Sequence, residues 1–332
     1  MAVREAALKL EVAKRKERSP WADALRQLLL NKVAVASGIF IIFVTLLAFV
    51  LAPYVIYPPK VNPSTGRSDI PYDRQTLVDN YSPPGGKYLL GADALGRDVL
   101  TRTVYGARVS LSVAFVAATV SLIIGMTYGL VSGYLGGMVD NVMMRIVDIL
   151  YGFPSLIFVI LLQVYFKALS RRGATGIAAP LIELDAKMGG MLFIFVALGA
   201  LNWIAMARIA RGQVLSYKEK EFIEAARMVG AGNARIIFRH LLPNILGPCI
   251  VYESLMIPAY IFTEAFLSFI GLGVTAPTPS WGIMVNEGYR AMRSHAHVLW
   301  PPAIALTITT LAFNFLGDGL RDAFDPRMRG TF

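Results

Sequence analysis

Six long apolar runs constrain the fold of this chain more than any other feature of its sequence. A helix needs about 20 residues to cross the ~30 Å hydrocarbon core of a bilayer. The runs cover residues 33–54, 109–133, 142–166, 191–209, 245–270 and 299–319. Only 16% of the 332 residues are charged, whereas soluble domains carry about 25%. The sequence therefore predicts an all-α membrane protein with six transmembrane helices.

Basic residues gather in the segments that a six-span count places on one side of the membrane. Residues 1–32 hold eight basic and four acidic side chains, the segment 210–244 holds six arginines and lysines, and the tail 321–332 holds three arginines. Fewer basic residues flank the runs on the other side. The positive-inside rule assigns the richer side, and with it both termini, to the cytoplasm. The net charge of +10 is thus a membrane feature, and we expect no nucleic-acid partner.

The predicted spans divide the chain into segments. An amphipathic helix is expected before the first span, because Ser19 can cap it and Pro20 fits its first turn; its apolar face suits the bilayer interface. The many charged residues before the first apolar run argue against a cleavable signal peptide.

The spans divide the chain into five predicted segments. Residues 1–32 form a cytoplasmic segment with the interfacial helix, 33–56 form the first transmembrane helix, and 57–106 form a periplasmic loop. Residues 107–320 form the transmembrane core, which includes a polar loop at 216–243, and residues 321–332 form a cytoplasmic tail.

Glycine and proline mark special positions within the spans. Gly125, Gly129, Gly133 and Gly137 recur every four residues, a spacing that places them on one helix face and lets a neighbouring backbone approach closely. Pro154 interrupts the third span, where a missing N–H permits bending. Residues 167–187 follow that span and mix Gly, Ala and one Pro; they are expected to form a second periplasmic loop with room for a helical turn.

The polar loop at 216–243 is predicted to form a short helix over 217–228. Phe222 and Ile223 alternate with charged residues there, as in an amphipathic helix. Gly230 follows, where a helix commonly ends in a left-handed residue that glycine adopts without steric cost. A short helix exposed in this way can be laid in the groove of a partner protein.

These features resemble one known family. The chain is similar to the C-type inner-membrane permease subunit of oligopeptide/dipeptide ABC importers, over nearly everything from Trp21 to Arg329. The matching stretches are LGADALGRD at 90–98, YGARVSL at 105–111, SGYLGG at 132–137, FIEAA at 222–226, LSFIGLG at 267–273, PSWG at 279–282 and GDGLRD at 317–322.

The resemblance implies a type I ABC importer permease fold whose cytoplasmic coupling helix docks on ATPase subunits. The implied ATPase-docking residues are Glu224, Ala225, Ala226, Gly230, Leu242 and Pro243. His240 departs from the general pattern, which has Ile there. The implied partners are a second homologous permease, two ABC ATPases that bind ATP and Mg, and an extracytoplasmic peptide-binding protein. The implied location is the bacterial inner membrane, and the implied substrate is a peptide, with glutathione or a nickel chelate as alternatives within the family.

Ionisable residues inside spans are candidates for function by default. Glu253 and Glu264 lie in the fifth span, where each could line a translocation path or be satisfied by a neighbouring helix. Arg145 and Asp148 are three residues apart in the third span and could pair. Their position near its cytoplasmic start favours a structural role, because anchoring charges are tolerated near the interface.

No catalytic or metal-binding motif stands out. The sequence has no GxxxxGK[ST] run to cradle ATP phosphates and no HExxH or GxSxG run. Cys249 is the single cysteine, and His295 and His297 lack an evident third ligand. We therefore expect a non-enzymatic subunit without its own cofactor. An ion-coupled secondary transporter is the rival class, but it leaves the 216–243 loop unexplained.

Overall fold

The computed structural model describes residues 20–56, 60–61, 68–172 and 178–324. Helices dominate these residues. Their only paired strands are β1 (Lys60–Val61) and β2 (Ser68–Asp69), which run antiparallel and are two residues long. The prediction of an all-α membrane protein is confirmed. Ser19 and the tail beyond residue 324 lie outside the described residues.

Five of the described helical stretches are long and apolar enough to cross a membrane. They are built from α3 (Lys32–Leu46) with the π-helical η1 (Leu47–Ile56); α4 (Val99–Leu135); α8 (Leu192–Lys218); α10 (Asn233–Arg235) with the π-helical η4 (Ile236–Leu241) and α11 (Leu242–Phe269); and η5 (Ala296–Val298) with α13 (Trp300–Phe324). The first, second, fourth, fifth and sixth predicted spans overlap these stretches over nearly their whole length.

The third predicted span is not one straight helix. It consists of α5 (Gly137–Tyr151) and α6 (Ser155–Arg172), which are bent by 76° at the break between them. Pro154 lies in this break, where it removes a backbone donor and disfavours helical geometry in the residue before it. The bent pair counts as a sixth span only if its two helices are taken together.

The expected loop at 167–187 is largely helical. Helix α6 continues to Arg172, and α7 (Ala178–Lys187) follows. The segment therefore holds more helix than the single turn expected from its mixture of Gly, Ala and one Pro, and Pro180 lies in the first turn of α7, where proline is well tolerated.

Helix α4 begins ten residues before the predicted second span, so residues 99–106 are helical rather than part of the 57–106 loop. Asp98 starts the helix: its side chain accepts hydrogen bonds from the backbone N–H groups of Leu100 and Thr101 at 3.4 and 3.0 Å. Such a cap satisfies donors that have no partner within the helix. The rest of the loop contains two 3-10 turns, η2 (Pro71–Asp73) and η3 (Leu77–Asp79).

Three of the four spaced glycines hold α4 against α8, as predicted. A Cβ atom on Gly125 would lie 2.6 Å from the backbone oxygen of Trp203, and one on Gly129 would meet the backbone oxygen of Ala207 at an even shorter distance. Gly133 faces Val214 in the same way. Gly137 does not belong to this seam, because it opens α5 with φ +55° and has nothing within 4 Å of a built Cβ.

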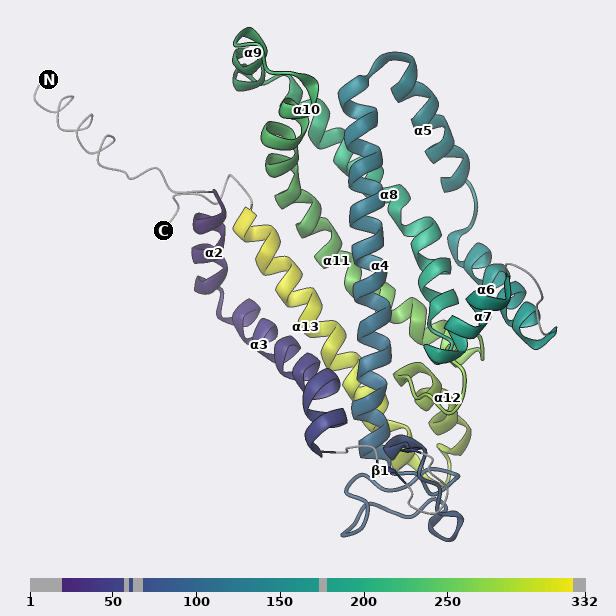
Figure 1. Cartoon of the computed structure of the whole chain (residues 1–332). Coiled ribbons are helices and arrows are strands. Elements are labelled where there is room, and N and C mark those ends of the chain that lie inside the picture. The colour runs from purple at the N-terminus through teal and green to yellow at the C-terminus, as the bar shows by residue number, and fades with distance from the viewer. Residues whose placement is uncertain (1–19, 57–59, 62–67, 173–177, 325–332) are drawn as a thin grey trace, which may run out of the picture.

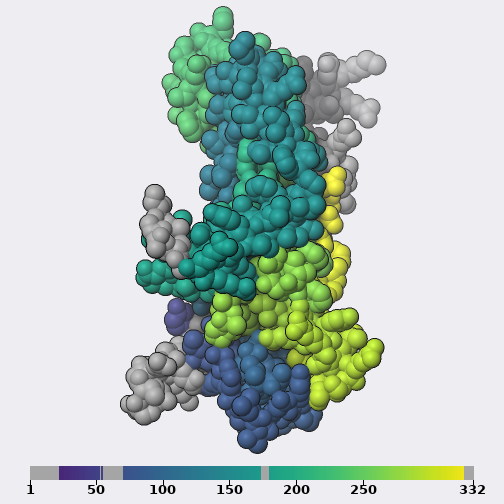
Figure 2. Space-filling view, turned by 90° about the vertical axis from the view of Figure 1, so that its right-hand side faces the viewer, coloured from purple at the N-terminus to yellow at the C-terminus, as the bar shows by residue number. Residues whose placement is uncertain are grey.

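The helices surround α4, which packs along both α8 and α11 (Figure 1). Helices α3 and α13 lie on one side of it, and the bent pair lies on the other. The bent pair and α7 (Ala178–Lys187) run along one face of the molecule (Figure 2). Helix α12 (Trp281–Ala291) and the 68–98 segment are at one end, and α9 (Glu221–Met228) is at the opposite end. Helix α2 (Pro20–Leu30) and the last turn of α13 face the α9 end (Figure 1).

Candidate functional site

Helix α9 is a short amphipathic helix held at the end of the molecule by one buried side chain. The structure ends α8 at Lys218 and begins α9 at Glu221, so the helix predicted over 217–228 is shorter than expected. Ile223 is 0% exposed. It lies in a cluster with side chains from α4, α8, η4 and α11, namely Leu130, Val214, Ile236, Leu241 and Ile245. Through Ile223, α9 is therefore packed against the ends of three long helices.

Gly230 ends α9 in the manner that the sequence predicts. Its φ is +83°, a left-handed conformation that glycine adopts at no steric cost. Its N–H donates to the carbonyl of Arg227 at 2.9 Å, and the N–H of Ala231 donates to the carbonyl of Ala226 at 3.0 Å. This pair of bonds is the Schellman motif, which satisfies the last carbonyls of a helix. The chain can thus reverse direction sharply after α9.

The six predicted docking residues fall into two groups. Glu224 and Ala225 are exposed and Ala226 is half-buried on α9, with Gly230 at its cap. Leu242 and Pro243 instead lie in the first turn of α11. Leu242 packs against the cluster that holds Ile223, whereas Pro243 is exposed.

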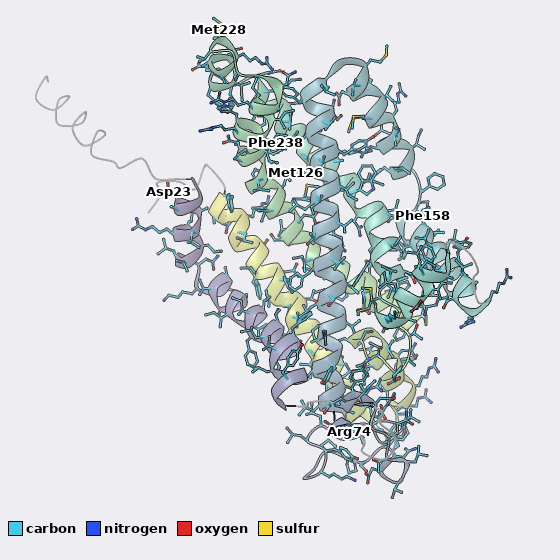
Figure 3. The ribbon with its side chains drawn as sticks, viewed as in Figure 1. Asp23, Arg74, Met126, Phe158, Met228 and Phe238 are labelled. Carbon is cyan, nitrogen blue, oxygen red and sulfur yellow. The ribbon has the colours of Figure 1, made fainter. Side chains whose placement is uncertain are left out.

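The structure adds apolar residues that were not among the predicted docking residues. Met228 and Val229 are 88% and 89% exposed, and Met228 stands at the tip of the molecule (Figure 3). Phe222 is 41% exposed on the same helix. Exposed apolar side chains gathered on one element are typical of a surface that binds a partner. Their signal in the sequence was the Met-Val pair directly before the capping glycine.

Polar contacts join the C-terminal end of α4, which lies near α9, to α5, α8 and α10. Arg211 of α8 holds the Asp140 carboxylate of α5 with two hydrogen bonds, at 2.6 and 2.5 Å, and the Ser132 hydroxyl of α4 donates to the same carboxylate. Bidentate arginine–carboxylate pairs are among the stronger polar contacts. The Tyr134 hydroxyl of α4 lies 2.7 Å from Oδ1 of Asn233 on α10. The elements on both sides of α9 are therefore tied to α4.

Asp148 does not pair with Arg145 in the way the sequence suggested. Its carboxylate accepts a hydrogen bond from Arg208 of α8 at 2.7 Å, and the Arg208 guanidinium also lies over the Tyr151 ring, 4.2 Å from the ring centroid. The contact is a second link between α5 and α8.

Glu253 and Glu264, the two candidates for a translocation path, are 4% and 0% exposed. Both face α4 from α11. The Glu264 carboxylate accepts hydrogen bonds from the Ser110 hydroxyl of α4 at 2.8 Å and from Ser268 of its own helix at 2.6 Å. Glu253 accepts from Ser121 of α4 and, at 3.1 Å, from Tyr260. Each carboxylate thus has partners on two sides, as buried polar groups require.

The opposite end of the molecule contains a buried charge cluster that sequence reasoning did not identify. Asp93 is 2% exposed, and it pairs with Arg97 at 2.7 Å and Arg102 at 3.3 Å. Arg102 also reaches Glu287 of α12 at 2.9 Å. The LGADALGRD segment is therefore joined to α12 by charge. Asp93 and Arg97 lie four residues apart in that segment, a spacing that could have indicated the pair.

His295 and His297 make separate contacts near this cluster. The His295 ring stacks on Tyr81 with 4.2 Å between ring centroids, and Nε2 of His297 lies 3.3 Å from the backbone oxygen of Ala92. Among the described residues, no group of three or more His, Cys, Asp or Glu side chains is arranged to hold a metal ion.

Comparison with known proteins gives two family matches. Residues 125–330 match the binding-protein-dependent transport system inner membrane component family. Residues 19–84 match the N-terminal transmembrane domain of oligopeptide transport permease C.

Relatives align over almost the full chain. The dipeptide transport system permease protein of Bacillus subtilis is 43% identical over 95% of this chain and 88% of its own length. The oligopeptide transport system permease protein of Escherichia coli K12 is 42% identical over 97% and 95%. The glutathione transport system permease protein of Pectobacterium atrosepticum is 36% identical over 94% and 93%. Among solved structures, a chain of the methionine ABC transporter MetNI matches 67% of this chain and 96% of its own, with a TM-score of 0.47 and 18% identity.

One family match covers more than half of the chain, and relatives more than 40% identical span nearly all of it. The chain therefore belongs to the family of inner membrane components of binding-protein-dependent transport systems.

Proposed function

We propose that this chain is the transmembrane permease subunit of an ATP-driven importer for peptides, and that α9 is the helix on which its ATPase subunits dock. The observation that carries the docking proposal is the combination found in α9. Its Ile223 is fully buried, whereas Met228 and Val229 beside the Gly230 cap are almost fully exposed. A helix fixed on one face and apolar on its free face is suited to insertion into a groove.

The contacts around α9 give this proposal a mechanical basis. Force applied to α9 reaches the cluster that surrounds Ile223, which includes Leu130 of α4, Val214 of α8 and Ile245 of α11. A closing movement of two docked ATPases would therefore move these three helices together, and so change the access of a substrate path from one side of the membrane to the other. ATP and Mg would be bound by the ATPases.

The arrangement of charge supports a cytoplasmic position for the α9 end. The loop between α8 and α11 holds basic residues, and α2 and the end of α13 face the same direction (Figure 1). The positive-inside rule places such an end in the cytoplasm. The opposite end, with α12 and the Asp93 cluster, would then face a peptide-binding protein, and a homologous permease would complete the pore.

Docking is tested with the complete transporter. Glu224→Lys and Gly230→Val are compared with Glu183→Lys, which reverses an exposed acid on α7 whose side chain is 68% exposed. We expect the first two variants to reach the membrane at normal levels but to lose ATPase co-purification and peptide uptake at least about tenfold, and the third to retain both. Normal, ATP-dependent uptake by the α9 variants would show that docking occurs elsewhere.

The peptide substrate rests on the relatives, two of which are described as dipeptide and oligopeptide permeases and one as a glutathione permease. Selection would fall mainly to the binding protein. Uptake of labelled dipeptides, longer peptides and glutathione by the complete transporter, each in competition with the others, distinguishes these substrates. Failure of all three to be imported would contradict the peptide assignment without affecting the docking assignment.

A further inference from the structure

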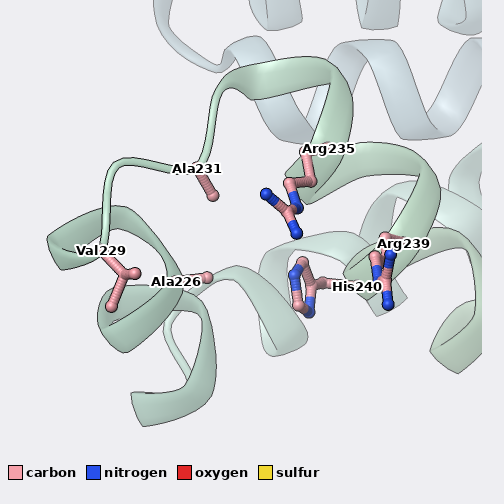
Figure 4. Close-up of a pocket in the computed structure, with 6 residues that line it drawn as sticks. All are labelled: Ala226, Val229, Ala231, Arg235, Arg239 and His240. Atoms are coloured by element: carbon pink, nitrogen blue, oxygen red, sulfur yellow. The ribbon is translucent and has the colours of Figure 1, made fainter.

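A cleft of about 200 Å³ lies between the end of α9 and the following α10–η4 segment. Its walls come from both elements (Figure 4). One wall consists of the small or apolar residues Ala226, Val229 and Ala231. The other wall consists of the basic residues Arg235 and Arg239 and the imidazole of His240. The side chains of Arg235 and His240 point toward the space between the two elements (Figure 4).

The cleft is basic and has no acidic wall. Among the described residues, neither Arg235 nor Arg239 has an ion-pair partner, and both are exposed. They are four residues apart on one helical segment, where like charges repel. The acidic residues of α9, Glu221 and Glu224, do not line the cleft. An entering anion would therefore relieve repulsion between the two guanidinium groups.

The size of the cleft favours a single side chain. Small-molecule sites usually enclose about 300–1,000 Å³, more than this cleft offers. Ala226 and Ala231 leave the room that larger residues would fill. Arginine forks match the planar carboxylate group with two parallel hydrogen bonds, so an Asp or Glu side chain fits both the volume and the donors.

The position of the cleft favours a protein over a lipid. Helix α9 stands well beyond α2 and the end of α13 (Figure 1), and α2 is the amphipathic helix expected to lie in the membrane interface. Val229, which lines the cleft, is 89% exposed and continues into the apolar tip at Met228. A basic cleft with an apolar rim is complementary to an acidic side chain carried on a protein surface.

We propose that the Arg235–Arg239–His240 cleft receives an Asp or Glu side chain of the subunit that docks on α9. This proposal rests on the proposed docking function, and it adds the chemistry of the contact. The acidic group enters beside Ala226, binds the two guanidinium groups and fixes how α9 sits on its partner.

The test measures binding of purified cognate ATPase to the permease pair in nanodiscs over a range of NaCl concentrations. The variant is Arg235→Gln/Arg239→Gln. The matched control is Arg26→Gln/Arg145→Gln, which removes two exposed positive charges from α2 and α5. We expect the cleft variant to raise Kd at least about tenfold and to flatten its salt dependence, because a desolvated charge pair is lost. The control should match wild type.

A second variant separates this proposal from the docking function itself. Gly230→Val alters the cap of α9 without changing charge. If it abolishes binding whereas the cleft variant keeps wild-type Kd and salt dependence, docking on α9 stands and the acidic contact is wrong. If neither variant changes Kd, both proposals are wrong.

Two further outcomes decide the occupant. The nanodiscs are made with phosphatidylcholine alone or with added phosphatidylglycerol. Phosphatidylglycerol could raise the unfolding midpoint of the permease pair. If the cleft variant loses only that increase and keeps a normal Kd for the ATPase, the cleft binds a lipid phosphate and the proposal is overturned.

A charge swap tests the contact directly. Transport that is lost in Arg235→Glu and regained when an Asp or Glu of the ATPase is changed to Lys would support a direct charge pair.

Discussion

Ser110 of α4 donates its hydroxyl hydrogen to the carboxylate of Glu264 on α11, with 2.8 Å between the two oxygens. The same contact recurs between Ser121 and Glu253. The serines are eleven residues apart on α4, and the glutamates are eleven residues apart on α11 in the opposite direction. Eleven residues make about three turns of α-helix, so both pairs lie along one seam and fix the antiparallel register of the two helices.

Removal of the Glu264 carboxylate should destabilise this seam. Glu264→Leu leaves the hydroxyls of Ser110 and Ser268 buried without an acceptor, which costs about 1–3 kcal/mol. Glu264→Gln keeps an acceptor oxygen and should cost less. The unfolding midpoint in detergent, followed by tryptophan fluorescence, checks both. Ser110→Ala combined with Glu264→Leu should be less damaging than the two single effects added together. Additive effects would mean that the pair does not interact.

Ile223 should control the order of α9. Its side chain is fully buried, and truncation of a buried isoleucine to alanine costs about 2–5 kcal/mol. In Ile223→Ala we expect faster amide exchange across 221–228 and loss of ATPase binding. Phe222→Ala, which shortens an exposed neighbour, should leave the exchange unchanged and weaken only the binding. Equal exchange in the two variants would show that Ile223 does not anchor the helix.

Gly230 should be sensitive to backbone conformation rather than to space. No atom lies within 4 Å of a Cβ built on it, but its φ is +83°. Gly230→Ala should therefore lose about 1–2 kcal/mol locally from the left-handed conformation alone, and Gly230→Asn should lose less. Uptake rates should rank glycine, asparagine, alanine. The matched site is Gly137, with φ +55° and open space, where the same substitutions should spare ATPase binding. If ATPase binding and uptake instead fell in the order of side-chain volume, glycine, alanine, asparagine, the backbone conformation of residue 230 would not be the cause.

Gly129 should be sensitive to space. A Cβ atom there meets the backbone oxygen of Ala207, and a backbone group cannot move aside as a flexible side chain can. Gly129→Ala should force α4 and α8 apart and lower both the unfolding midpoint and the yield of folded protein. Gly212 of α8 has open space around it, so Gly212→Ala is the control. Unchanged stability of Gly129→Ala would mean that the seam relaxes at little cost.

The sequence allowed most of the spans to be predicted because a membrane helix satisfies its backbone internally and shows its length directly in hydropathy. Pro154 indicated that the third span could bend, but not by how much, because hydropathy summed along a run carries no direction and two helices at 76° look like one run. The start of α4 was misplaced for a related reason. Thr101 and Arg102 are polar, so hydropathy does not mark them as part of the span, whereas in the structure they follow the Asp98 cap at the start of α4.

In the candidate site, features set by neighbours in sequence were predictable, whereas contacts between distant helices were not. Local rules anticipated the α9 helix and its Gly230 cap, since both depend on neighbours in sequence. The partners of Glu253, Glu264 and Asp148 depend instead on which helices are adjacent, and the spacing within one span does not contain that information. Asp148 therefore seemed matched to Arg145, three residues away, although its partner in the structure is Arg208, sixty residues away.

The close packing of α4 against α8 allows α4 to move as one rigid rod. The 37 residues of α4 make a rod about 55 Å long at about 1.5 Å per residue. A tilt of about 5° around one end carries the other end by about 5 Å, roughly one turn of helix. Glycine contacts with α8 and serine–glutamate contacts with α11 stiffen this rod along its length. A tilt imposed at the α9 end, as the proposed coupling requires, would therefore carry the Asp93 end by about this distance, provided that neither seam slips.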